Sequence, residues 1–476
     1  MRARLRSSFF LAVLASAGAC GGDDGAAPGP DATTLPAWRP DLPPSTVMGI
    51  RRGLQSARGI IHLHSPYSHD ACDGNPRPGG APDETCLEHL RAALCTTRMD
   101  FAALTDHDAS MADEDFTTLF LQRGGDTLVR DEGGAPIASR LGCPDGRKVL
   151  LTVGSENPIM PIMLDRHVDG TVGERHAIYD GDDTDTVAAM RAAGATIWIP
   201  HTEQRTTEKL VELAPDGIEI YNLHANIDPD IRRDFLDLPE DGAITAALSF
   251  GGMDVDGPEP DLALLGFLAP STPALTRWDE LLAQGLHVSG SAGTDAHENT
   301  LPVMLKDGER GDSYRRLMRW FSNIVLVRDP RDPVQIEEGI RAGRMFVAFE
   351  LLGTPVDFEV RAVASDRVAE IGDSLPVDIG AQLEVNFPTI HELSPLLPAP
   401  TIHARVLRID GAGVTEVAAG DGPTLSVPLD RVGAYRVEVT MVPRHLAPYL
   451  GRLGPAYAQQ ELPWIYANPI YVLPVR

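Results

Sequence analysis

Positive charge is scarce in this chain of 476 residues, which has 41 Lys and Arg residues against 68 Asp and Glu residues. The resulting net charge of -27 repels phosphate backbones, so we expect no nucleic-acid partner. Apolar runs are also short, and none approaches the roughly 20 residues that a membrane-spanning helix needs. With 43% hydrophobic residues, the chain still has the composition of a globular protein, and its length favours two domains.

Several catalytic signatures are missing as well. The sequence has no G-x-S-x-G elbow, no Walker loop and no His-Glu-x-x-His pair. The acidic run at residues 180–185 is similar to a calcium loop but lacks the glycine at its sixth position, which favours a solvated turn. The sequence therefore indicates neither an elbow-type serine hydrolase nor a P-loop protein.

Cysteine is rare, with five residues in the whole chain. No C-x-x-C pair occurs, which argues against a zinc knuckle. Apart from Cys20, the cysteines are Cys72, Cys86, Cys95 and Cys143, an even number that predicts two disulfides if the protein is exported. Three connectivities of these four residues remain open.

The first 20 residues have the pattern of an export signal. Three arginines lie within the first six positions, and residues 9–19 form a short apolar run. The small residues before Cys20 resemble a bacterial lipoprotein lipobox, although Ala17 stands where that pattern has leucine. This resemblance implies a lipid on Cys20, with cleavage at an ordinary secretory site as the alternative. We expect a protein of the bacterial envelope, in the periplasm or at the cell surface, held to the membrane by its lipid alone.

The rest of the chain falls into three parts. Residues 21–56 are rich in Gly, Pro and Asp and predict a flexible tether. Residues 57–350 alternate short β-branched runs with helical patterns, which is typical of an α/β domain with parallel strands. Residues 351–476 have β-type runs with turns, such as 401–409 and 435–442, and predict a smaller β-sandwich domain.

Within the α/β part the strands are expected at residues 59–64, 101–105, 149–155, 196–200, 217–221 and 287–291. A helix is expected at 86–96, with Thr85 and Glu88 as a capping box, and another at 184–193, ended by Gly194.

Metal-binding residue types stand at the ends of these strands. Parallel α/β sheets bind ligands beyond the carboxyl ends of their strands, so these side chains converge on one mouth. Imidazoles with a few carboxylates suit Zn, Mn or Fe, and the absence of cysteine favours a hydrolytic centre over a structural one. The strand-end residues are His62 and His64, Asp106 and His107, Glu156, His201, Glu219, and Asp295 and His297.

These motifs resemble the PHP (polymerase and histidinol phosphatase) family of metallohydrolases over roughly residues 59–349. The segments that carry the resemblance are 62–64, 68–70, 105–107, Glu156, 200–201 and 293–297. Together with residues 464–471 near the C-terminus, the layout looks like the exported branch related to carbaryl hydrolase. The resemblance implies a distorted β/α barrel of seven strands that holds two or three divalent ions (Zn, Mn or Fe).

Carried over by position, the resemblance also implies a ligand set. One metal would be held by His62, His64, Glu156 and Asp295, and a second by His107 and His297, with Glu156 as the bridge. A further ligand of the second metal would be His69 or Asp70, with His69 preferred. A third metal would use His201 and either His167 or His176, with His167 preferred.

The same resemblance implies that a hydroxide bridging two metals attacks the substrate, most readily a phosphoester. The catalytic groups would be Glu156, Asp295 and His297, while Asp106 would orient a metal-bound imidazole or a backbone group. The candidate substrate-binding residues are Arg205, Tyr221, Asn222 and His224, each of which has a surface or helix-capping role as its alternative.

We therefore expect a small anionic substrate, and the sequence leaves the oligomeric state open. The same residues are also compatible with two other functions. One is a carbamate or amide hydrolase, because acyl chemistry needs the same hydroxide. The other is a cell-surface binding lipoprotein that keeps the fold without turnover.

Overall fold

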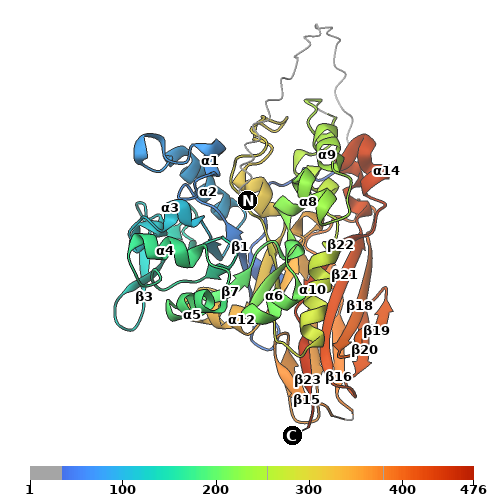
Figure 1. Cartoon of the computed structure of the whole chain (residues 1–476). Coiled ribbons are helices and arrows are strands. Elements are labelled where there is room, and N and C mark those ends of the chain that lie inside the picture. Colours follow the sequence, from blue (N-terminus) through green and yellow to red (C-terminus); the bar gives the residue numbers. More distant parts are fainter. Residues whose placement is uncertain (1–34, 255, 379, 476) are drawn as a thin grey trace, which may run out of the picture. The chain divides into compact units, whose positions relative to one another are not determined.

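A computed structural model of the chain describes residues 35–254, 256–378 and 380–475 (Figure 1). Ala37–Arg476 form one compact unit. The expected signal at residues 1–20, the lipidation site Cys20 and the first part of the tether lie outside the described residues. In the described ranges, no helix combines the length and the apolar character needed to cross a membrane.

A large mixed sheet of 13 strands runs through the described residues. Its main path is β15 (Ser374–Pro376), β23 (Ile470–Leu473), β21 (Gly433–Val442), β22 (Leu462–Ala467), β11 (Met345–Ala348), β10 (Ser322–Val327), β1 (Gln55–Leu63), β2 (Phe101–Leu104), β5 (Lys148–Val153), β4 (Pro136–Gly142) and β3 (Thr127–Arg130). Two more strands, β18 (Thr401–Asp410) and β19 (Gly413–Gly420), extend it from β21.

A second sheet carries the remaining parallel strands. It consists of β6 (Met160–Ile162), β7 (Thr196–Ile199), β8 (Gly217–Asn222) and β9 (Ser289–Gly293), in that order. The pairs β7/β8 and β8/β9 are parallel, as are β1/β2 and β2/β5 of the large sheet. Two isolated bridges, Leu63 to Ala296 and Val153 to Leu164, join the two sheets near the carboxyl ends of β1 and β5. The parallel α/β expectation is thus met, while the seven-stranded barrel stays a prediction.

The C-terminal part is rich in strands, as its sequence predicts. It adds a sheet of β14 (Val368–Glu370), β13 (Glu359–Val363), β16 (Gln382–Asn386) and β20 (Thr424–Pro428), and a pair of β12 (Pro355–Val356) with β17 (Thr389–Ile390). However, β21 and β22 belong to the large sheet, and β22 pairs directly with β11. The sheet therefore continues across residue 350, and the boundary drawn there, like the β-sandwich, stays a prediction.

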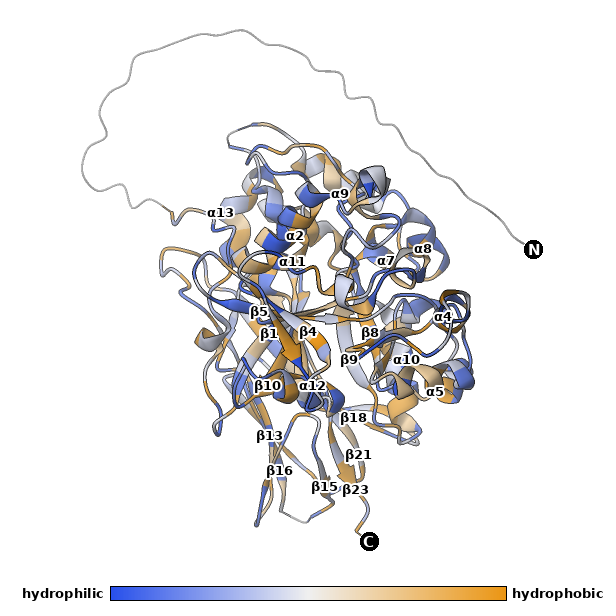
Figure 2. Ribbon diagram, turned by 90° about the vertical axis from the view of Figure 1, so that its left-hand side faces the viewer, coloured by the Kyte–Doolittle hydropathy of each residue, from blue (hydrophilic) through white to orange (hydrophobic). Residues whose placement is uncertain are grey.

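The helices flank these sheets, and Figure 2 shows hydrophilic residues along α2 and α8. They are α1 (Ala71–Gly74), α2 (Glu84–Thr96), α3 (Asp108–Met111), α4 (Val172–Tyr179), α5 (Thr184–Ala192), α6 (Thr207–Leu213), α7 (Leu223–Ile227), α8 (Pro229–Asp234), α9 (Gly242–Phe250), α10 (Thr272–Ala283), α11 (Tyr314–Trp320), α12 (Pro333–Arg341), α13 (Ala447–Leu450) and α14 (Gly454–Tyr457).

Two sequence expectations need correction. The tether was expected to reach residue 56, but Leu42 and Met48 are buried and Ser45–Met48 form a short 3-10 helix, so the later part of this segment packs against the core. The cap of α2 is Asp83, whose carboxylate accepts from the amides of Thr85 and Cys86, and not the predicted Thr85. Asp is as effective a cap as Ser, and the helix begins two residues earlier than expected.

The cysteines form two disulfides, Cys72–Cys86 and Cys95–Cys143. Two disulfides were predicted, and this is confirmed. The pairs tie the two ends of α2 to the α1 segment and to the end of β4.

Candidate metal centre

The predicted strand-end residues gather where the two sheets meet. His62 lies at the end of β1, Asp106 and His107 follow β2, and Glu156 follows β5. His62 and His64 are two residues apart in extended chain, so their rings face the same side, and their Nε2 atoms lie 3.1 Å apart. His201 and the 295–297 segment follow β7 and β9 of the other sheet.

Three groups of side chains in the described residues could hold a metal ion, and within each group the donor atoms lie within 4.8 Å of one another. Neighbouring groups share ligands: His64 belongs to the first and second, and Asp295 belongs to the first and third. The groups are His62, His64, Glu156 and Asp295; His64, Asp70, His107 and His297; and His201, His224 and Asp295.

Glu156 lies at the middle of this arrangement. Its Oε2 is 3.4 Å from Nε2 of His64 and 3.5 Å from Nε2 of His107. Its Oε1 is 3.3 Å from Nε2 of His201, a member of the third group. One carboxylate therefore faces all three groups, as a bridging ligand must.

Most of the imidazoles are oriented by a second contact at Nδ1. Nδ1 of His62 lies 2.7 Å from Glu219 Oε1, and Nδ1 of His107 lies 2.8 Å from the carbonyl oxygen of Glu156. Nδ1 of His297 is 2.8 Å from the carbonyl oxygen of Asp295. An imidazole that donates from Nδ1 presents the lone pair of Nε2, which is the form that binds a metal.

Two buried atoms of the centre have no hydrogen-bond partner. They are Oδ1 of Asp295 and Nε2 of His297. Buried polar atoms are nearly always paired, because an unpaired one costs about 1–3 kcal/mol. A divalent cation would satisfy both atoms, so the residues present fit such ions.

The charges of the centre are strongly coupled. Burial by itself lowers the pKa of His62, but the negative charges of Glu219, Asp295 and Glu156 outweigh it and raise that pKa well above 6.5. Burial by itself would raise the pKa of Asp295, but the charge of His62 and the hydrogen bonds from His201 and His224 hold it well below its ordinary value. A cation entering the centre would therefore displace protons from imidazoles.

The loop after β1 decides between two predicted ligands. Oδ2 of Asp70 is 3.6 Å from Nε2 of His107 and 3.4 Å from Nε2 of His297, within the second group. His69 is exposed and only its ring lies near His107, at 5.2 Å between centroids. The structure thus places Asp70 in the centre and not the preferred His69.

The predicted third-group ligand His167 is elsewhere. Its Nε2 bonds to the carbonyl oxygen of Glu114 and its Nδ1 to the hydroxyl of Tyr179, and it belongs to none of the three groups. The alternative, His176, pairs with Asp108 at 2.7 Å. The prediction of His167 is wrong because α7 brings His224 to Asp295 instead, with Nδ1 3.0 Å from Oδ2.

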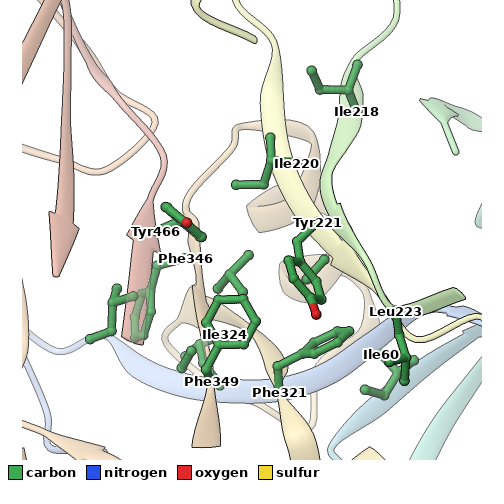
Figure 3. Close-up of a cluster of buried hydrophobic side chains, with 14 of the residues drawn as sticks. Ile60, Ile218, Ile220, Tyr221, Leu223, Phe321, Ile324, Phe346, Phe349 and Tyr466 are labelled. Atoms are coloured by element: carbon green, nitrogen blue, oxygen red, sulfur yellow. The ribbon is translucent and has the colours of Figure 1, made fainter. Parts of the chain in front are cut away.

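The predicted substrate-binding residues of β8 have structural roles. Tyr221 is fully buried among Phe321, Phe349 and Ile324 (Figure 3), and its hydroxyl donates to the carbonyl oxygen of Phe267. Asn222 caps α7 by accepting from the amide of Ala225. Both predictions fail because β8 is buried along its whole length.

Two other predicted residues act through the backbone. The guanidinium of Arg205 donates to the carbonyl oxygen of Pro158 at 2.6 Å and to Asp182 at 3.3 Å, so it holds the loop after Glu156. Asp106 accepts from the amide and the hydroxyl of Ser65, at 2.6 and 2.7 Å. Asp106 therefore holds the backbone after His64 and belongs to none of the three groups.

Sequence reasoning gave Glu219 no role and His224 no place among the ligands. Glu219 had one usable signal, because it belongs to the set of strand-end acidic residues. His224 was predicted only as a substrate-binding residue, because its place beside Asp295 depends on the tertiary packing of the short helix that follows β8.

Comparisons with known proteins add little at this level of similarity. No family model matches the chain, and no curated protein matches it. Among solved structures, it is similar to a two-domain protein containing a predicted PHP-like metal-dependent phosphoesterase from Bacteroides vulgatus ATCC 8482, at 11% identity and a TM-score of 0.32, over 91% of this chain and 100% of that chain. It is also similar to PsfC from Pseudomonas syringae PB-5123, at 11% identity and a TM-score of 0.29, over 60% of this chain and 88% of that chain.

Proposed function

We propose that this chain is a metal-dependent hydrolase of the PHP type that acts on phosphoesters. The observation that carries the proposal is the sharing of ligands among three adjacent groups, through His64 and Asp295, with Glu156 facing all of them. Shared ligands bring cations close together, which is the arrangement that in-line phosphoryl displacement uses.

The first group would hold one ion through His62, His64, Glu156 and Asp295, and the second would hold another through Asp70, His107 and His297. A third ion would use His201 and His224. Such ions supply Lewis-acid activation of water and stabilise charge on the leaving oxygen.

The chain's own residues keep this centre rigid and set its open side. His62 and His64 are fully buried, whereas the side chains of His224 and Asp70 are 50% and 37% exposed. We infer that substrate enters past His224 and Asp70, because their side chains are exposed while the histidines of β1 and of the residue after it are buried. Ser65, held by Asp106, keeps the backbone after His64 in place.

The proposal extends to the parts outside the centre. We propose a seven-stranded PHP-type barrel with a C-terminal β-sandwich, an export signal at residues 1–20 and a lipid anchor on Cys20. The two disulfides support export, because such bonds persist in oxidising compartments.

The test combines metal analysis with a substrate panel. Purified protein should contain two or three equivalents of Zn, Mn or Fe and should hydrolyse phosphomonoesters or phosphodiesters. Exhaustive chelation should abolish turnover, and added metal should restore it. Activity confined to aryl carbamates would replace the substrate class, whereas bound metal without turnover on any substrate would favour a binding protein.

A further inference from the structure

A cavity away from the metal centre lies on the opposite edge of the large sheet, at the start of β1 and not at its end. Its volume is about 580 Å³, and its lining includes Gln55 at the start of β1, Lys148 at the start of β5 and Arg328 after β10. Gln55 and His62 are seven residues apart on one strand, which corresponds to about 23 Å. The cavity is therefore separate from the metal centre.

The lining of this cavity is basic, in contrast to the chain as a whole. It contains six cationic side chains and two carboxylates, Asp100 and Asp329, whereas the chain has 41 cationic residues against 68 acidic ones. A concave surface of one sign concentrates the field and raises the local concentration of the opposite charge. The cationic side chains are Arg98, Arg140, Arg147, Lys148, Arg328 and Arg331.

Three of these cations lack a carboxylate partner. Arg147 and Arg98 both pair with Asp145, at 2.8 and 4.0 Å, and Arg331 pairs with Asp329 at 3.0 Å. Within the described ranges, Arg140, Lys148 and Arg328 form no ion pair, and the ammonium group of Lys148 donates only to the carbonyl oxygen of Gly125. Their charges are therefore available to a ligand.

We infer that this cavity binds a small multivalent oxyanion, such as a phosphorylated or sulfated group. The volume lies in the range of small-ligand sites, roughly 300–1,000 Å³. Guanidinium groups match the oxygen geometry of phosphate and sulfate through paired hydrogen bonds, and the arginines of this lining come from several separate segments of the chain. The excess of cations over carboxylates in the lining favours an anion of more than one charge. The source of the group is either a soluble metabolite or a lipid headgroup.

The test is calorimetric titration of the metal-loaded protein with inorganic pyrophosphate at about 0.15 M salt. The double variant Arg140→Gln/Arg328→Gln should bind pyrophosphate at least tenfold more weakly through this site. The matched control Arg431→Gln/Arg452→Gln removes two exposed charges that do not line the cavity and should bind like the wild type. Metal content and turnover should be the same in all three proteins, since the two sites are further apart than the Debye length of about 8 Å.

Pyrophosphate also has affinity for metal ions, but binding at the metal centre is the same in each variant and does not change the comparison. A second arm measures sedimentation with vesicles of phosphatidylglycerol and of phosphatidylcholine. The inference is supported if the cavity variant, and not the control, binds either ligand more weakly than the wild type. Weaker binding of pyrophosphate indicates a soluble metabolite, and weaker binding of phosphatidylglycerol vesicles indicates a lipid headgroup. Equal binding by the wild type and the cavity variant in both arms overturns the inference.

Discussion

Glu219 and His62 form a fully buried carboxylate–imidazole pair, with Oε1 2.7 Å from Nδ1. The other oxygen of Glu219 accepts from the amide of His201 at 3.1 Å and from the side-chain amide of Asn222 at 2.9 Å. Gly293 makes room for this pair, because a Cβ there would collide with Oε1 of Glu219. One carboxylate on β8 thus positions ligands that come from both sheets.

Replacing this carboxylate should weaken metal binding without removing a ligand. In Glu219→Gln, the side-chain oxygen of the glutamine can still accept from His62. Its NH₂ group then faces the amide groups of His201 and Asn222, which are donors themselves, so these contacts are lost. We expect metal affinity to fall about 10–100-fold, as for other groups that orient metal-bound histidines. Competition with a chromophoric chelator measures this affinity. Glu208→Gln, at an exposed site on α6, is the matched control, and equal affinities in the two variants would contradict the positioning role.

Variants of Asp295 and Asp106 should differ in metal content, because the first residue is proposed as a metal ligand and the second as a positioning residue. Asp295 belongs to two of the three groups, so Asp295→Ala should lose at least one equivalent of metal and nearly all turnover. Asp106→Asn keeps a similar shape and should retain metal. It should lose about 1–3 kcal/mol of stability, because an asparagine has one acceptor oxygen in place of the two that accept from the amide and the hydroxyl of Ser65. Elemental analysis of both variants decides the matter. Full metal content in Asp295→Ala would refute the site.

The metal-free protein should lose stability as the pH rises. Burial lowers the pKa of His107, but the nearby carboxylates of Asp70 and Glu156 outweigh it and raise that pKa from 6.5 to about 9. The folded state therefore binds this proton more tightly than the unfolded state does. The stabilisation is complete below pH 6.5 and is lost as the pH rises through about 9, amounting to at most about 3 kcal/mol.

Urea unfolding of chelated protein at pH 6, 7.5 and 9.5 measures this loss. A His107→Gln variant, also metal-free, should show a flatter profile over the same range. Stability that increases with pH in the chelated wild type would show that the proton is not held as described.

A buried ion pair connects the α/β part to the segment at residue 350. Nη2 and Nε of Arg58 each lie 2.8 Å from an oxygen of Glu350, and both side chains are fully buried. Glu350→Ala leaves Arg58 charged and unpaired, so unfolding free energy should fall by about 3–5 kcal/mol. The exposed pair of Glu337 with Arg341 provides the control, and Glu337→Ala should cost about 0.5 kcal/mol or less. Equal losses in the two variants would argue against a structural role of the buried pair.

The disulfides should be present in protein taken from an oxidising compartment. Mass mapping should find the pairs Cys72–Cys86 and Cys95–Cys143 and no others. The sequence separations are 14 and 48 residues, so loss of the second bond should cost about 1 kcal/mol more than loss of the first. Denaturant titration of Cys72→Ser/Cys86→Ser and Cys95→Ser/Cys143→Ser compares them. Four free thiols in such material would overturn the assignment.

The sequence by itself predicted the features that depend on local pattern. Alternating apolar runs indicated the parallel strands, and β2, β5, β7, β8 and β9 appear within two residues of their expected bounds, whereas β1 begins four residues earlier than expected. The strand-end position of His62, His64 and Glu156 followed from those strands, because carboxyl ends of parallel strands meet at one edge. The even number of cysteines after Cys20 likewise predicted two disulfides.

Only the tertiary structure decided which side chains meet across long separations. His224 and not His167 joins Asp295 because α7 directly follows β8, which pairs with the strand that leads to Asp295. Asp70 reaches the centre, whereas the neighbouring His69 is exposed. The pairing of β11 with β22 continues the large sheet across residue 350, although the sequence pattern changes there from alternating strands and helices to β-type runs. Periodicity reports which face of an element is buried and not which element covers it, so these contacts depend on packing of the whole chain.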